Sequence, residues 1–135
     1  MGLLFQPVTS RAATDKCTVN LTKEALGSGL VVHDWHDMYA AYKKYGACDD
    51  GALAEEFSDR VVNLLTDHWD KFGELNKLVI QDRSFEDFIM RHLDDLMSPV
   101  QFNKIVDNAS NNCPTYGKDL CAGILRRTKE LAAEP

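Results

Sequence analysis

The chain has 135 residues, 44% of them hydrophobic and 27% charged, which suits one folded domain without a structural metal. Its 21 acidic residues outnumber 15 basic ones, for a net charge of −6. This balance argues against binding to nucleic acid or to an anionic membrane surface, because both need clustered Lys and Arg. The sequence contains no apolar run of the roughly 18–20 residues that span a membrane, so we expect no membrane insertion.

Residues 1–13 (MGLLFQPVTSRAA) are not typical of a folded domain. Apolar residues 3–5 are followed by Ser10-Arg11-Ala12-Ala13, which has small residues at the −3 and −1 positions of a signal cleavage site. We interpret the segment as the remnant of a secretory leader, and a vector-derived or disordered arm is the alternative. We expect residues 14–131 to form a single helical domain and residues 132–135 to fray.

Apolar residues within that domain recur at helical spacing, and no segment alternates with period two for long enough to form a strand. The sequence therefore predicts an all-α fold, a single compact bundle of five to six short helices. The first part, residues 14–31, gives the weakest pattern, and Gly27-Ser28-Gly29 predicts a loop. The residues that we expect to face the core are Trp35, Met38, Tyr39, Tyr42, Leu53, Phe57, Val61, Leu64, Leu65, Trp69, Leu75, Leu78, Val79, Phe85, Phe88, Ile89, His92, Leu93, Leu96, Phe102, Ile105, Val106, Ala109, Leu120, Cys121, Ile124, Leu125 and Leu131.

Capping signals divide the chain into these helices. The residues that we expect at helix starts are Asp34, Asp49 or Asp50, Ser84 with Asp87, and Ser98 with Gln101. Pro99 favours the first helical position after Ser98. Gly46 ends one helix, and Asn111-Asn112 before a proline ends another.

Four cysteines without a CxxC pair favour disulfide bonds over zinc or a redox centre. Four cysteines allow three pairings, and the sequence does not decide among them. Cys113 and Cys121 flank a turn-rich segment, so a bridge between them would clamp two consecutive helices. Cys17 would then pair with Cys48 and pin the N-terminal arm. Both bridges would place the protein in an oxidising compartment, whereas four reduced cysteines would indicate the cytosol.

Most of the excess negative charge lies in residues 31–60, where seven acidic residues face three basic ones. The candidate partner-binding residues in this acidic stretch are Asp49, Asp50, Glu55, Glu56 and Asp59. They predict a docking surface for a basic protein partner, or else ordinary helix N-terminal carboxylates on a solvated face. Adjacent carboxylates do not face each other across a substrate, so their spacing does not indicate acid–base hydrolysis.

Three further clusters have both a functional and an ordinary interpretation. His33, His36 and Asp37 could converge on a metal ion, although they also suit a solvated helix start. His92 lies on an apolar stripe, which favours a hydrogen-bonded core histidine over a general base. The basic residues near the C-terminus suit the end of a helix and need no partner. They are Arg126, Arg127 and Lys129. We therefore expect no catalytic residues and no cofactor.

Two runs of residues carry a resemblance that spans roughly residues 29–131. They are Trp35…Tyr39…Tyr42…Cys48-Asp49-Asp50-Gly51 with Phe57-Ser58-Asp59, Val61-Val62, Leu64-Leu65 and Trp69, and Phe85…Phe88…His92-Leu93-Asp94 with Cys113-Pro114 and Cys121. They resemble a group of small exported proteins of Gram-negative bacteria, most of which lack an assigned activity. In size, helical class, cysteine use and acidity, the chain is also similar to periplasmic immunity proteins of type VI secretion amidases. No residue of that family's inhibitory loop is matched here, so its contacts are not carried over.

This similarity implies a non-enzymatic periplasmic protein that blocks a secreted peptidoglycan amidase, a cell-wall hydrolase with a basic surface. A homodimer is compatible with the same expectation. The alternatives are a carrier of a lipid or other apolar ligand, and a metal-binding periplasmic protein. An aromatic-rich helical domain can enclose the apolar cavity that a carrier needs.

Overall fold

The computed structural model describes residues 16–134, so the predicted leader of residues 1–13 lies outside the described part. Those residues form seven α-helices, linked by short 3-10 and π turns, and contain no strand. The helices are α2 (Val19–Glu24), α3 (Trp35–Tyr45), α4 (Gly51–Asp67), α5 (Phe72–Gln81), α6 (Arg83–Arg91), α7 (Pro99–Asn111) and α8 (Lys118–Ala133). The all-α prediction is confirmed, and α2 is the helix that the sequence did not predict.

The ends of the helices follow the predicted capping signals, with one correction. Asp34 caps α3 by accepting a hydrogen bond from the Asp37 amide at 2.8 Å, and Ser98 forms the predicted capping box of α7. The predicted start of α6 at Ser84 is wrong, because the extended residue Asp82 accepts from the Ser84 amide and begins the helix earlier. At the C-terminus, α8 continues through Ala133, two residues into the segment expected to fray.

A second correction concerns the predicted loop at Gly27-Ser28-Gly29. The backbone there forms a π-helical turn, Ala25–Gly29, that continues directly from α2. Ala25, the first residue of this turn, is buried. The Tyr45 hydroxyl of α3 donates a hydrogen bond to the carboxylate of Glu24, the residue before the turn. Contacts to α3 therefore hold the segment in a helical path that its glycines alone would not favour.

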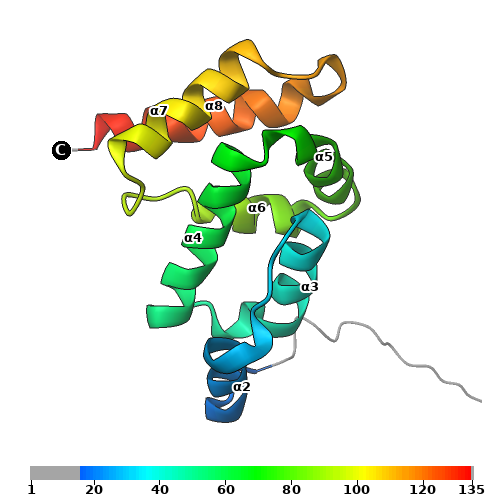
Figure 1. Cartoon of the computed structure of the whole chain (residues 1–135), viewed down its shortest axis with the longest axis vertical. Coiled ribbons are helices and arrows are strands. Elements are labelled where there is room, and N and C mark those ends of the chain that lie inside the picture. Colours follow the sequence, from blue (N-terminus) through cyan, green and yellow to red (C-terminus); the bar gives the residue numbers. More distant parts are fainter. Residues whose placement is uncertain (1–15, 135) are drawn as a thin grey trace, which may run out of the picture.

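Helix α4 lies beside α3 and α6, and α5 packs against α3 and α6 (Figure 1). The antiparallel pair α7 and α8 lies across one end of the molecule, and α2 lies at the other. Asn108 of α7 donates to the Leu65 carbonyl of α4 at 3.0 Å, and Arg127 of α8 donates to the Met90 and Leu93 carbonyls at the end of α6. These bonds fix the α7–α8 pair to the rest of the fold.

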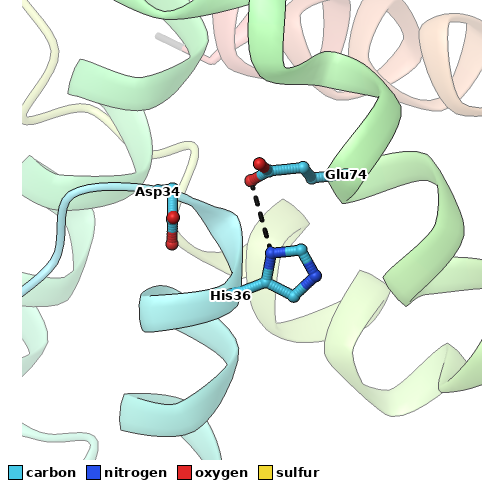
Figure 2. Close-up of side chains that lie close together, drawn as sticks. All are labelled: Asp34, His36 and Glu74. Atoms are coloured by element: carbon cyan, nitrogen blue, oxygen red, sulfur yellow. Dashed lines mark ion pairs between the residues drawn. The ribbon is translucent and has the colours of Figure 1, made fainter.

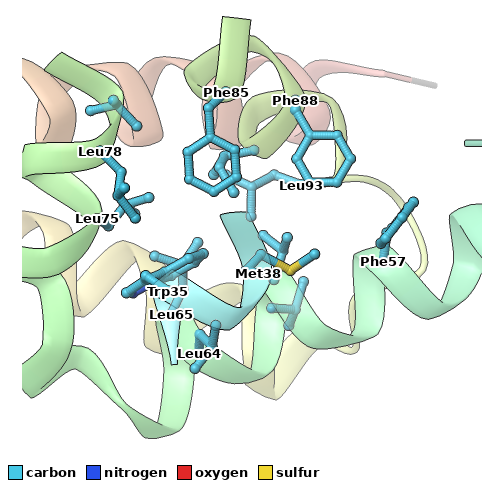
Figure 3. Close-up of a cluster of buried hydrophobic side chains, with 14 of the residues drawn as sticks. Trp35, Met38, Phe57, Leu64, Leu65, Leu75, Leu78, Phe85, Phe88 and Leu93 are labelled. Carbon is cyan, nitrogen blue, oxygen red and sulfur yellow. The ribbon is translucent and has the colours of Figure 1, made fainter. Parts of the chain in front are cut away.

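The buried side chains of all the longer helices form one hydrophobic cluster (Figure 3). Phe57 of α4 meets Phe88 of α6 edge-on with ring centroids 5.1 Å apart, a favourable arrangement for aromatic rings. Most of the expected core positions are buried. Leu96 is a wrong prediction, because it follows the end of α6 and is 60% exposed. The other exceptions are only half-buried, namely Tyr39, Tyr42, Trp69, Phe102, Val106, Leu125 and Leu131.

Both predicted disulfide bonds are present. Cys17–Cys48 ties the segment before α2 to the turn before α4, and Cys113–Cys121 ties the segment after α7 to the first turn of α8. Closing loops of 31 and 8 residues stabilises the fold by about 3–4 and about 2–3 kcal/mol in the chain-entropy model. Such bonds persist in oxidising compartments. Over residues 16–134, no helix has both the length and the apolar character that crossing a bilayer requires.

Candidate functional site

The predicted acidic surface lies on the first half of α4. Glu55 and Asp59 are exposed and stand one helical turn apart. Glu56 is half-buried and pairs with Arg60 at 3.2 Å, and Arg60 also reaches Asp59 at 3.2 Å. Asp50 caps the helix by accepting from the Gly51 amide at 2.9 Å. Four of the five predicted residues therefore lie on the surface, and the base beside them is Arg60.

A small cleft opens between this face of α4 and the loop that follows α6. Its volume is about 170 Å³, and three of its lining residues are acidic: Glu55, Asp59 and Asp94. No lysine or arginine lines it, and Leu96 and Met97 supply apolar surface at its edge. Since typical small-molecule sites measure about 300–1,000 Å³, the cleft suits a single basic side chain better than a whole ligand.

Asp49 is the member of the predicted set that the structure removes from the surface. Its side chain is only 9% exposed, with Oδ2 at 2.8 Å from His92 Nε2 and 3.2 Å from Arg91 Nη2. Burial acts to raise the pKa of Asp49, but the bond from His92, helped by Arg91, outweighs it and holds the pKa below its ordinary value. Its carboxylate is therefore bonded to side chains within the protein rather than exposed on the acidic surface.

His92 connects Asp49 to a second buried contact behind the cleft. Its Nδ1 lies 2.7 Å from Ser58 Oγ, and Ser58 in turn donates to Asp94 Oδ2 at 2.6 Å. Both Ser58 and His92 are 3% exposed. The hydrogen-bonded core histidine that the sequence predicts is confirmed, and it links the turn before α4, α4 itself and the loop after α6.

These residue types are those of a hydrolytic triad, but their arrangement differs from one. A serine nucleophile gives its hydroxyl proton to the histidine base. Ser58 lies in the middle of α4, is 3% exposed, and also donates a hydrogen bond to Asp94 Oδ2 at 2.6 Å. The network is better understood as a polar brace that positions Asp94 at the wall of the acidic cleft.

Sequence reasoning missed Ser58 and Asp94. A signal for Ser58 was available, since it shares a helical arc with buried Val62 and Leu65, and a hydroxyl on such an arc needs a partner. No comparable signal marked Asp94, which comes from a loop 36 residues further along the chain.

The candidate metal ligands His33, His36 and Asp37 do not meet at one point. His33 pairs with Asp37 at 3.3 Å, while His36 turns away to Glu74 of α5 at 3.6 Å. Asp34, His36 and Glu74 are the three groups that lie close together, with their ligand atoms within 4.8 Å of one another (Figure 2). Each already has a local role, because Asp34 caps α3 and Glu74 accepts from the Trp35 amide at 3.2 Å.

Comparisons of the chain with models of protein families, with curated proteins and with solved structures give no match.

Proposed function

We propose that this protein is a non-enzymatic, exported binding protein whose acidic cleft receives a basic group of a protein partner. The observation that carries the proposal is the coincidence of the predicted acidic surface with a hollow lined by Glu55, Asp59 and Asp94 and by no base. A cleft with charges of one sign steers a partner of the other sign and fixes its orientation.

The surroundings of the cleft favour a protein over a free cation. Leu96 projects beside it with 60% of its surface exposed, an apolar contact that a protein surface can bury. The Ser58–His92 network and the Cys17–Cys48 bond hold the flanking segments in place before binding. A preformed site loses less conformational entropy when its partner arrives.

The partner that we propose is a peptidoglycan amidase delivered by type VI secretion, and the protein would be its periplasmic immunity protein. Support comes from the similarity in size, helical class, cysteine use and acidity described above. An amidase with a basic mouth would present lysine or arginine to the cleft, and the body of the bundle would then exclude the peptidoglycan substrate.

The test is affinity capture from a periplasmic extract of the source organism, followed by a peptidoglycan digestion assay on whatever hydrolase is captured. The variant Glu55→Lys/Asp59→Lys should lose the hydrolase and its inhibition. A matched control is Asp70→Lys, which reverses an exposed acid beyond the other end of α4. Equal capture by all three proteins, or capture of no cell-wall hydrolase, would refute the proposal.

A further inference from the structure

An apolar groove lies between α7 and α8, away from the acidic cleft. Its volume is about 640 Å³, and its apolar lining includes Phe102 and Val106 of α7 and Leu125 of α8. This volume falls within the usual range of sites for small organic ligands.

The groove follows from a surplus of apolar positions on these two helices. Ile105 and Ala109 of α7, with Ile124 of α8, are buried in the core. Phe102 and Val106, one helical turn apart, lie on an adjoining face that no other helix of residues 16–134 covers. The Cys113–Cys121 bond and the hydrogen bond from Asn108 to Leu65 hold the pair in place, so the groove exists without a ligand.

Charge at the groove is opposite to that of the whole protein. Arg126 and Lys129 line it, no acidic residue does, and neither base forms an ion pair with any residue of the described chain. The neighbouring Arg127 differs, since it pairs with Glu130 at 3.2 Å and donates to two carbonyls of the α6 end. In a chain of net charge −6, two bases without an ion pair in the described part of the chain, beside an apolar groove, indicate an anionic, largely apolar ligand.

We propose that this groove binds a single-chain anionic amphiphile, a long-chain carboxylate such as a fatty acid. Its alkyl chain lies over Phe102, Val106 and Leu125, and its carboxylate pairs with Arg126 and Lys129. This site is separate from the acidic cleft, and the proposal does not depend on the immunity function.

The experiment titrates the full-length, untagged protein with decanoate, dodecanoate and tetradecanoate below their micelle concentrations. Isothermal titration gives the affinity, and amide NMR shifts give the location. We expect shifts confined to α7 and α8, and an affinity that rises by up to about fourfold for each methylene that becomes fully buried.

Three variants make the test specific. Arg126→Glu/Lys129→Glu should weaken dodecanoate binding by tenfold or more, and Ala122→Trp should fill the groove and abolish binding. The matched control Lys43→Glu/Lys77→Glu makes the same change in net charge on exposed residues of α3 and α5 and should bind as the wild type does.

Three outcomes would overturn the proposal. The first is the absence of binding at millimolar ligand. The second is binding that the Arg126/Lys129 and Ala122 variants leave unchanged, which would indicate non-specific association. The third is a dimer, detected by light scattering, whose interface covers the groove, because the occupant would then be a second copy of the chain.

Discussion

Removal of the His92 imidazole should destabilise the fold more than removal of any exposed histidine. The variant His92→Ala breaks the bonds to Ser58 and to Asp49 and leaves a buried carboxylate without its main donor. Asp49 Oδ1 already lacks a hydrogen-bond partner within the described chain. After the substitution, Asp49 Oδ2 would keep only the bond from Arg91 among its contacts in that part of the chain. The ring also packs against Phe88, with centroids 4.6 Å apart.

Leaving a buried charged acceptor without its donor costs more than the about 1–3 kcal/mol of a neutral group, and loss of an aromatic contact adds about 0.5–1.5 kcal/mol. We therefore expect His92→Ala to lose about 3–5 kcal/mol, measured as a shift of the urea midpoint at neutral pH with the disulfides intact. The control His36→Ala removes a histidine whose side chain is 66% exposed and should change stability by no more than about 0.5 kcal/mol. If both variants unfold at the same urea concentration, the network does not brace the fold.

A double-mutant cycle separates the network from simple loss of packing. Ser58→Ala alone should cost about 1–3 kcal/mol, because Asp94 and His92 each lose a partner. The double variant His92→Ala/Ser58→Ala should then be less destabilised than the sum of the two single variants. Strict additivity would show that the two residues act independently.

Three other predictions test the electrostatics, the disulfides and the helix starts. The pKa of Asp49 is lowered in the folded protein, so its stabilisation is complete above the ordinary carboxyl value of 3.8 and is lost as pH falls through the folded value. Asp49→Asn should therefore be less stable at pH 7 and show a flatter loss of stability between about pH 5 and 2 than the exposed control Asp59→Asn, as measured by urea unfolding across that range. Cys17→Ser/Cys48→Ser should lower thermal stability more than Cys113→Ser/Cys121→Ser, since the first bond closes a loop of 31 residues and the second one of 8; the reverse order in calorimetry would contradict the chain-entropy argument. Ser98→Ala should cost about 1 kcal/mol through the lost capping box, whereas Ser110→Ala, on an exposed position of the same helix, should have little effect in the same urea assay.

The fold was predictable where its causes are local. Asp34 and Ser98 begin helices because a side-chain oxygen satisfies amides within the next turn, and that requirement is visible in a few adjacent residues. The Cys113–Cys121 pairing was favoured over the other two possibilities for a similar reason, since the two cysteines are only 8 residues apart. The apolar stripe of α4 predicted the buried face of the helix correctly, because a helix of 17 residues repeats the helical spacing over several turns.

The candidate site was less predictable because distant segments assemble it. The pairing of Asp49 with His92 joins residues 43 positions apart, and a one-residue difference decides which of two adjacent aspartates caps α4 and which is buried. For α7 and α8, the sequence did not distinguish apolar residues of the core from apolar residues that line a surface groove. Phe102 and Leu125 fit a core face by spacing, but only packing shows that they form the side of an open groove.

The proposals for the acidic cleft and the apolar groove can be tested separately, because the two sites share no lining residue. Gln101 lines the acidic cleft, and Phe102 lines the apolar groove. Reversal of Arg126 and Lys129 leaves the cleft unchanged, so that variant should capture the same hydrolase as the wild type. Reversal of Glu55 and Asp59 should likewise leave dodecanoate affinity nearly unchanged, since neither residue lines the groove and salt screens exposed charges. If one set of substitutions abolishes both activities, the two surfaces form a single interface and neither assignment is correct as stated.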